Sequence, residues 1–356
     1  MSRKYFTEDE MNRIGTYPSV AGLFGNPQPS YPKYNRPVTS RENFELLING
    51  KTPYWAPNLL SDFNLLQPLI MKDAEARSHG GLDWFGIEWQ YEPLTGSPMV
   101  KPGTRRLSGL ENWREELEWP DLDAIDWEAD VRENFSNLPE DRPNLFLIVN
   151  GYFERLADLT SFEDAFCYLI EEPEEMNEFY TRLTDWHIHL VEIAKKYYNA
   201  DIILLHDDMG TQRSTFFSTV MYVEHLQPHY KRFTKAVHDL GMHAAVHSCG
   251  CISTHIPEFI NSGFEMWEGQ FNANNMQQLM DTYGDKLGQI EWFHVPPNST
   301  EEEAHALIKS RIDGVGATGR YMNRLYDDAD RLVSSNEYMY RISREKYDRL
   351  FDQRGY

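Results

Sequence analysis

The chain has 356 residues, a formal net charge of −22 and an aromatic content of 9 Trp, 20 Tyr and 19 Phe, which is ample material for one large core. The acidic balance and the lack of a basic stripe argue against nucleic acid as a partner, and no apolar run reaches the roughly 20 residues that a membrane-spanning helix needs. The opening residues lack the apolar segment of a signal peptide, and 3 cysteines do not make a disulfide framework, so we expect a reducing, cytoplasmic location.

Residues 1–40 are polar and rich in Pro, Tyr and Asn, and we interpret them as an extended N-terminal arm before the main domain, residues 41–356. A first helix follows the arm, because Thr39 or Ser40 can cap it and Gly50 can end it. Short apolar runs further along the chain predict strands at 54–57, 83–89, 145–150, 201–206, 242–247, 264–268, 288–293 and 315–318.

Helical patterns separate most of these strands, and a final helix closes the chain. The patterns lie at 171–199, 218–240, 253–262, 273–283 and 300–313. The segment 92–143, rich in Pro, Trp and acidic residues, is interpreted as an insertion after an early strand. Short apolar strands that alternate with helices indicate a parallel sheet. About eight such units in one chain predict an α/β fold of a single (β/α)8 TIM barrel.

Polar residues gather where the predicted apolar strands stop, on one strand after another. In a parallel barrel these carboxyl ends meet at one face, which carries the active site. The pattern therefore predicts a polar mouth with a pocket for a small molecule. The residues that we expect to bind substrate there are Trp89, Asn150, Tyr152, Asp207, Gln270 and His294.

The segment "HSCGC" places His247 and Cys249 two residues apart at the end of a predicted strand. On extended chain both side chains face the same way, and imidazole with thiolate suits Zn²⁺. Glu268, at the end of the next strand, can add a carboxylate, which completes the three protein ligands of a catalytic zinc. Cys251 lies one step into the following turn and is the weaker candidate ligand. The alternative is a strand-end turn with a buried thiol and a hydrogen-bonded histidine.

The segment "HDDMGTQ" places two adjacent carboxylates after another apolar strand. On extended chain they point to opposite faces, so one faces the pocket and the other caps a loop or helix. We assign Asp208 to the pocket, as an acid, a base or a cation ligand. The catalytic residues predicted from the sequence are therefore Asp208, His247 and Glu268. The alternative is that both Asp207 and Asp208 accept backbone N–H groups at a helix start.

Taken in order, several segments resemble the uroporphyrinogen decarboxylase superfamily from about residue 40 onward. They are "RENFELLINGKTPYWAPN", "DWFGIEWQY", "LENWREELEWPDLD", "GYFERLADLTSFEDAF", "EEPEEMNEFYTRL", "HDDMGTQRSTFFS", "HSCGCISTHIPEFINSGFE" and "YMYRISREKYDRLF". The resemblance implies a (β/α)8 barrel. It also implies one of two activities: porphyrinogen decarboxylation, or methyl transfer that involves a corrinoid protein.

The arginine content separates these two activities. Decarboxylases of the superfamily carry an arginine-rich motif that binds the carboxylates of the substrate, whereas this chain has no arginine between Arg41 and Arg77. The methyltransferase branch carries H-x-C-G after a central strand, and residues 247–250 match it. There the pair resembles a zinc site, with Glu268 matching a further ligand of some members. A decarboxylase of a smaller carboxylic acid is the alternative function.

One departure concerns the thiol-methylating members, which use another zinc-binding cysteine near the last strand, where this chain reads "GVGATGRYMN". Either a different set that includes Cys251 holds the zinc, or no metal binds. Demethylation of an aryl methyl ether or a methylamine fits the chain better than thiol methylation. No corrinoid-binding "DxHxxG" segment occurs, so the resemblance implies cobalamin on a separate corrinoid protein. Homodimerisation is left open.

Overall fold

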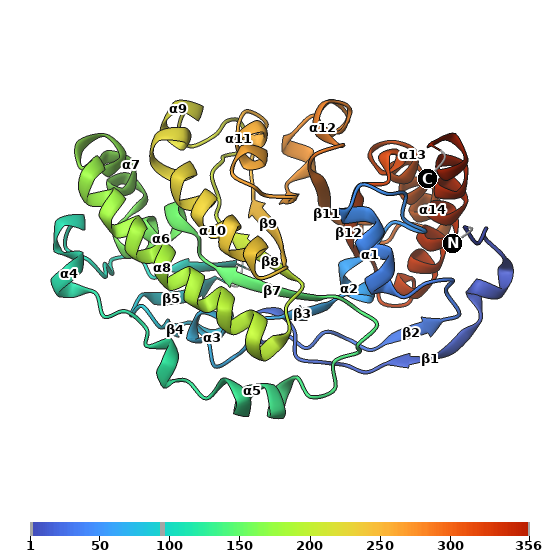
Figure 1. Ribbon diagram of the computed structural model, residues 1–356, viewed down its shortest axis with the longest axis horizontal. Coiled ribbons are helices and arrows are strands. Elements are labelled where there is room, and N and C mark those ends of the chain that lie inside the picture. The colour runs from blue at the N-terminus through green and yellow to red at the C-terminus, as the bar shows by residue number, and fades with distance from the viewer. Residues whose placement is uncertain (1–2, 93–96, 355–356) are drawn as a thin grey trace.

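The computed structural model describes residues 3–92 and 97–354 (Figure 1). A strongly curled parallel sheet forms its centre, and within the described residues its strand order is β12-β11-β10-β9-β8-β7-β3. The neighbouring strands of this order follow one another along the chain, as in a barrel. The strands are β3 (Asn64–Leu66), β7 (Asn144–Val149), β8 (Ile202–His206), β9 (His243–Ser248), β10 (Met266–Gly269), β11 (Gly288–His294) and β12 (Tyr321–Tyr326).

The two edges of this sheet approach each other through one short segment. The amide of Asn323 on β12 donates to the carbonyl of Pro57 at 3.0 Å, and Asn58 forms a parallel bridge with Asn323. After the short helix α2 (Leu59–Asp62) the chain enters β3, which pairs with β7 at the opposite edge. The α/β class with a TIM-barrel-like sheet is therefore confirmed, whereas the strand predicted at 54–57 does not form, and the bridge at this place belongs to the next residue, Asn58.

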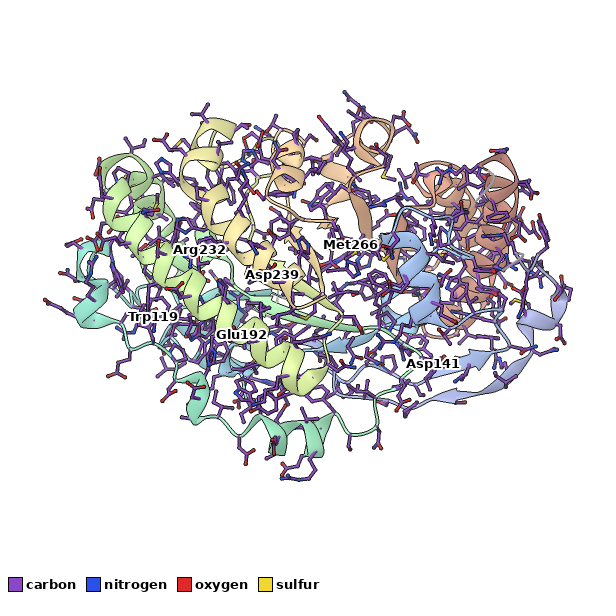
Figure 2. All side chains as sticks on the ribbon, viewed as in Figure 1. Trp119, Asp141, Glu192, Arg232, Asp239 and Met266 are labelled. Atoms are coloured by element: carbon purple, nitrogen blue, oxygen red, sulfur yellow. The ribbon has the colours of Figure 1, made fainter. Side chains whose placement is uncertain are left out.

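Alternate residues of the strands fill the inside of the curl with an apolar core. Helix α1 (Ser40–Ile48) adds Phe44 and Leu47 to it, and Met266 of β10, labelled in Figure 2, belongs to it. As predicted, Thr39 caps α1, in a capping box with Glu42. The strand residues of this core are Leu65, Leu145, Leu147, Val149, Ile202, Leu204, Ala245, Met266, Ile290 and Met322.

Amphipathic helices follow the strands and bury their apolar faces in a second, larger core. No helix that the structure describes is both long and apolar enough to cross a membrane. The helices are α6 (Tyr152–Leu159), α7 (Phe162–Glu171) and α8 (Pro173–Tyr198) after β7; α9 (Thr219–Met221), η5 (Tyr222–Leu226) and α10 (Gln227–Asp239) after β8; α11 (Ile256–Asn261) after β9; α12 (Met276–Tyr283) after β10; α13 (Glu301–Asp313) after β11; and α14 (Leu332–Arg354) after β12.

Two further strand predictions were wrong in detail. Residues 83–89 form no barrel strand, because the Asp83 side chain accepts the amides of Phe85 and Ile87 at 2.9 Å and folds the chain into a turn. The strand there, β5 (Glu88–Glu92), instead belongs to a small antiparallel sheet with β4 (Gly81–Leu82) and β6 (Ser97–Val100), next to α3 (Lys72–His79). Residues 315–318 form a 3-10 turn, and the last barrel strand is β12.

The segment predicted as an insertion, 92–143, contributes β6, α4 (Trp113–Glu116) and α5 (Trp127–Asn134), and its residues 93–96 lie outside the described part. The predicted N-terminal arm folds back on the barrel from residue 3 onward. It forms the antiparallel pair β1 (Arg13–Tyr17) and β2 (Tyr31–Tyr34). Arg3 pairs with Asp348 of α14 at 2.7 Å, and Glu10 pairs with Arg344 at 2.8 Å, so buried ion pairs fix the arm to the last helix.

Candidate functional site

A row of polar residues crosses the sheet at the carboxyl ends of three neighbouring strands. His206 of β8 pairs in register with His247 of β9, which pairs in register with Glu268 of β10. Residues in register on parallel strands face the same side, so these three side chains lie together on top of the apolar interior. The convergence of His247 and Glu268 at the barrel mouth thus follows from strand register.

His247 is 3 % exposed and has a partner at each ring nitrogen. Its Nδ1 lies 2.8 Å from the carboxylate of Glu268, while its Nε2 lies 3.4 Å from the sulfur of Cys249 and 3.6 Å from the carboxylate of Asp208. Burial and the neighbouring His206 lower the pKa of His247, but Cys249 and Glu268 raise it more, to about 9. Glu268 therefore orients the ring from one side, and Nε2 faces Cys249 and Asp208 on the other.

Glu268 is itself 2 % exposed and also forms an ion pair with Arg324 of β12 at 2.6 Å. Burial raises the pKa of Glu268, but Arg324 and His247 outweigh burial and hold it at about 2. The carboxylate is ionised at neutral pH and has a positive partner on one side and an imidazole on the other. Arg324 therefore holds Glu268 in place, and Glu268 in turn orients the ring of His247.

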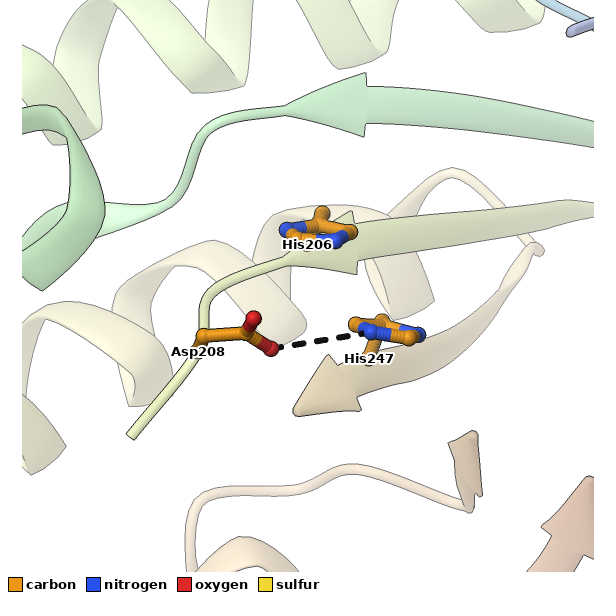
Figure 3. A group of neighbouring side chains, drawn as sticks. All are labelled: His206, Asp208 and His247. Carbon is orange, nitrogen blue, oxygen red and sulfur yellow. Dashed lines mark ion pairs between the residues drawn. The ribbon is translucent and has the colours of Figure 1, made fainter. Parts of the chain in front are cut away.

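The ring of His206 stacks on that of His247, with centroids 4.2 Å apart and planes 11° from parallel. Figure 3 shows both rings at the ends of adjacent strands, with Asp208 beside them. Nδ1 of His206 lies 2.7 Å from Glu154 of α6. Burial lowers the pKa of His206, but Glu154 and Asp208 raise it to about 9. Each histidine thus has its own carboxylate at Nδ1, which is buried for Glu268 and 14 % exposed for Glu154.

His206, Asp208 and His247 form a group that can hold a metal ion, because one ligand atom of each lies within 4.8 Å of the others. Zinc fits this donor chemistry, and a carboxylate on the remote nitrogen of a ligating histidine is the usual supporting arrangement. The stacked rings add one condition. An ion lies in the plane of each imidazole that binds it, so one ring must tilt for both to bind.

The structure thus modifies the ligand set expected from the sequence. Glu268 and Cys249 contact different nitrogens of His247, on opposite edges of the ring, so one ion at Nε2 is out of line with Glu268. The predicted ligand role of Glu268 stays a prediction, and its position favours an orienting role. Cys251 lies beyond the strand end, where its amide donates to the carbonyl of Thr211 at 2.7 Å, and both Cys249 and Cys251 are outside the group of ligand atoms.

The two adjacent aspartates point in opposite directions. Asp207 is fully buried and accepts the amides of Tyr152, Phe153 and Glu154 at the start of α6, together with the hydroxyl of Tyr230. Asp208 has a side chain 29 % exposed, accepts the amide of Cys249 at 2.6 Å and faces His247. The predicted division between one cap and one pocket residue matches this geometry, and the position of Asp207 does not support its predicted role in substrate binding.

Three other residues predicted to bind substrate lie inside the protein. Tyr152 is fully buried, with its hydroxyl 3.1 Å from Thr184. Asn150 is 1 % exposed, and its side chain contacts Arg77 and Asp158. Trp89 is 4 % exposed in the small antiparallel sheet, where its indole donates to Asp83 at 3.0 Å. Their polar groups are engaged within the protein, which corrects their expected placement at the mouth.

Gln270 and His294 do lie at the mouth. They line a cavity of about 610 Å³ together with His247 and Cys249. Gln270 accepts from the amide of Gly250 at 3.1 Å, and His294 is exposed. The cavity opens on the row of polar residues, so a small molecule in it can reach the Nε2 edge of His247.

Sequence analysis assigned no role to four residues that shape this site: Glu154, His206, Trp292 and Arg324. For His206 the signal was present, since it stands two residues before Asp208 on extended chain, as His247 stands before Cys249. Arg324 was missed with its strand, β12. Trp292, two residues after the interior Ile290, faces the mouth and stands 5.6 Å from the ring of His247.

Comparisons with known proteins show the fold. No protein-family model matches the sequence, and a search of curated proteins finds no relative. Among solved structures, a methyltransferase from Methanosarcina mazei superposes with a TM-score of 0.59 at 12% identity, covering 87% of this chain and 99% of that chain. A sugar phosphate isomerase/epimerase from Parabacteroides distasonis matches with a TM-score of 0.35 at 8% identity, covering 71% of this chain and 82% of that one.

Proposed function

We propose that this protein is a methyltransferase that moves a methyl group from a small methylated substrate to the corrinoid of a partner protein. One observation carries the proposal: His206 and His247 each have a carboxylate at Nδ1, and the two histidines lie with Asp208 in one group of possible metal ligands at the barrel mouth. The likeness of the fold to the Methanosarcina mazei methyltransferase supports it.

The chemistry of demethylation fits these residues. The oxygen of an ether or the nitrogen of an amine leaves poorly unless it receives a proton or binds a Lewis acid while the methyl carbon is attacked. His206, Asp208 and His247 would hold a zinc ion, with Cys249 as a further candidate ligand, and zinc would supply that Lewis acidity. Glu154 and Glu268 would fix the orientation of the two imidazoles through their Nδ1 atoms.

The corrinoid is the acceptor in this proposal and is carried by another protein. The sequence contains no "DxHxxG" segment, and the candidate site lies at the open end of the barrel, next to a cavity of about 610 Å³. A partner that docks over this mouth would bring the acceptor to the methyl group. Closure by the partner would also exclude water from the site, which strengthens electrostatic contacts to the leaving atom.

Two measurements on purified protein test the proposal. The first follows the visible spectrum of reduced cobalamin with a panel of aryl methyl ethers and methylated amines. We expect a substrate-dependent spectral change that is lost in His247→Ala and His206→Ala and kept in the matched control His189→Ala. His189 lies in α8 with its side chain 39 % exposed. No spectral change with any donor would contradict methyl transfer, and release of carbon dioxide from a carboxylic acid without corrinoid would establish the alternative decarboxylase.

The second measurement is zinc content after purification without chelators. We expect zinc in the wild type and in the His189→Ala control, and its loss in the two site variants. Equal and negligible zinc in all four proteins would remove the metal from the proposal. His247, Asp208 or both would then have to protonate the leaving group directly.

A further inference from the structure

A second cavity of about 440 Å³ lies next to the site, between the N-terminal arm and the rim of β11 and β12. Its walls are mostly apolar, and its size falls within the range of small-molecule sites. It meets the first cavity at Trp292, which lines both. The side chains of its walls include Leu23, Phe24, Pro27, Pro29, Tyr31, Leu60, Leu65, Trp292, Arg324, Leu325, Tyr326, Asp327 and Leu332.

The loop of the N-terminal arm that forms one wall of this cavity is held in place by the buried side chain of Gln28. Val20 and Gln28 close a loop through two backbone hydrogen bonds, of 3.2 and 2.9 Å. The side chain of Gln28 donates to the carbonyls of Leu60 and Phe63 at 2.7 Å and accepts from the amide of Leu65 at 3.2 Å. The loop is therefore a fixed part of the cavity.

Trp292 is the wall that the second cavity shares with the candidate site. Its side chain stands in the open mouth and is 46 % exposed, although it follows the strand alternation that buries Ile290 in the interior. The ring centroids of Trp292 and His247 are 5.6 Å apart, and the guanidinium of Arg324 lies 5.7 Å from the indole. A flat molecule packed on Trp292 in the second cavity therefore ends close to His247.

Two charged side chains line this cavity, and their bonding differs. Asp327 is saturated, because its oxygens accept from Arg331, from the hydroxyl of Ser335 and from the amide of Asp328. Arg324 uses its Nε in the ion pair with Glu268, and its guanidinium borders the cavity at 5 % exposure. Glu268 balances the charge of Arg324, but a guanidinium has five N–H donors and can donate to a second anion, whereas Asp327 has no acceptor left for a cation, so an anion is favoured.

We propose that the second cavity binds the ring of a small aromatic anion, of the arene carboxylate class, stacked on Trp292 with its charge toward Arg324. This binding stands on the geometry of the cavity and does not require methyl transfer. Where the proposed function also holds, it selects a methoxylated aromatic acid over a methylated amine as donor, because a cationic ligand meets a guanidinium in an apolar enclosure.

Calorimetric titration of the whole protein with benzoate and with phenyltrimethylammonium, in the absence of corrinoid, tests the proposal. We expect benzoate to bind at least tenfold more tightly than the cation. Trp292→Ala should weaken benzoate binding about tenfold, because it removes one aromatic contact and the area buried against it. Leu23→Asp should weaken it at least as much, because it places a negative charge in the arm wall of this cavity alone.

The control is Tyr91→Ala, which removes an aromatic side chain of similar exposure, 42 %, in the small antiparallel sheet. It should bind benzoate as the wild type does. Three results would each overturn the proposal. The first is that the Trp292 and Leu23 variants bind benzoate as tightly as the wild type does, the second is that the protein prefers the cation, and the third is that neither probe binds. Benzoate has no methyl group to donate, so a failure of methyl transfer in the cobalamin assay leaves this result standing, and the reverse also holds.

Discussion

Replacing Glu268 by glutamine removes one buried charge and leaves its partners in place. Glu268 is 2 % exposed and lies 2.6 Å from Arg324 and 2.8 Å from Nδ1 of His247. Gln has nearly the same shape, so the change leaves the packing intact and isolates the charge. Arg324, whose side chain is 6 % exposed, then lacks its carboxylate in a site with little access to water.

We expect the variant Glu268→Gln to lose about 3–5 kcal/mol in free energy of unfolding, the usual cost of leaving one half of a buried ion pair. With an unfolding entropy of about 2.1 cal/mol/K per residue over 356 residues, that loss lowers Tm by about 4–7 °C. Zinc affinity, measured by chelator competition, should fall about 10- to 100-fold, because the orienting partner of His247 is weakened.

The double variant Glu268→Gln/Arg324→Gln provides the decisive comparison. It removes both charges, so we expect it to recover a large part of the stability that either single variant loses. Thermal and urea unfolding of the four proteins give the interaction energy. Two results would refute the idea that this pair is coupled. Either the single variants unfold with a free energy within about 0.5 kcal/mol of wild type, or the double variant loses as much stability as the two single variants together.

Two further predictions concern the remaining acidic residues near the site. Asp207→Ala removes the cap of α6 and a partner of Tyr230, so it should lower the free energy of unfolding in urea by about 3–5 kcal/mol. Asp208→Ala should lower it by less than about 1 kcal/mol and should instead lose zinc. Equal losses of stability in the two variants would contradict the division of the two aspartates between a cap and the pocket. Burial raises the pKa of Asp158 from 3.8 to about 7 against the opposing charge of Arg77, so between these values the folded protein holds a proton that the unfolded chain has lost. Its contribution to stability is therefore present below pH 4 and falls by about 1.4 kcal/mol per pH unit up to about pH 7. Burial raises the pKa of Asp73 and Asp207 to about 7 as well, so Asp158→Asn should remove only this share of the slope from unfolding curves measured between pH 5 and 7.

The sequence was most informative where strands are buried on both faces. Residues 145–149 and 202–205 are continuous apolar runs because one face meets the interior core and the other meets the helices. β12 was not predicted, because its buried residues include Asn323, which bonds to Pro57, and Arg324, which pairs with Glu268. Polar residues that are buried because they bond to distant parts of the chain interrupt the apolar pattern, so the pattern of this segment is typical of a loop.

The candidate site was predictable in its residue types more than in its geometry. Spacing on extended chain places His247 and Cys249 on one face, and strand order adds Glu268. Which ring nitrogen meets which partner depends on the χ angles and on the register between strands, and the sequence does not encode these locally. The same argument explains why Asp207 and Asp208 could be divided between a cap and the pocket, while Glu154 on α6 could not be anticipated as the partner of His206.

The charge balance of the site explains why a cation is expected there. Among the described residues, the carboxylates of Glu154, Asp208 and Glu268 contact the two imidazoles, and Arg324 pairs with one of these three. With both imidazoles neutral, two negative charges in a largely buried region lack a positive partner, which is costly. Two protons can supply the missing charge, but they create two imidazolium rings stacked at 4.2 Å that repel each other. A divalent ion held by His206, Asp208 and His247 would supply the same charge and leave each Nδ1–H to donate to its carboxylate, so metal binding would avoid the repulsion between two charged rings.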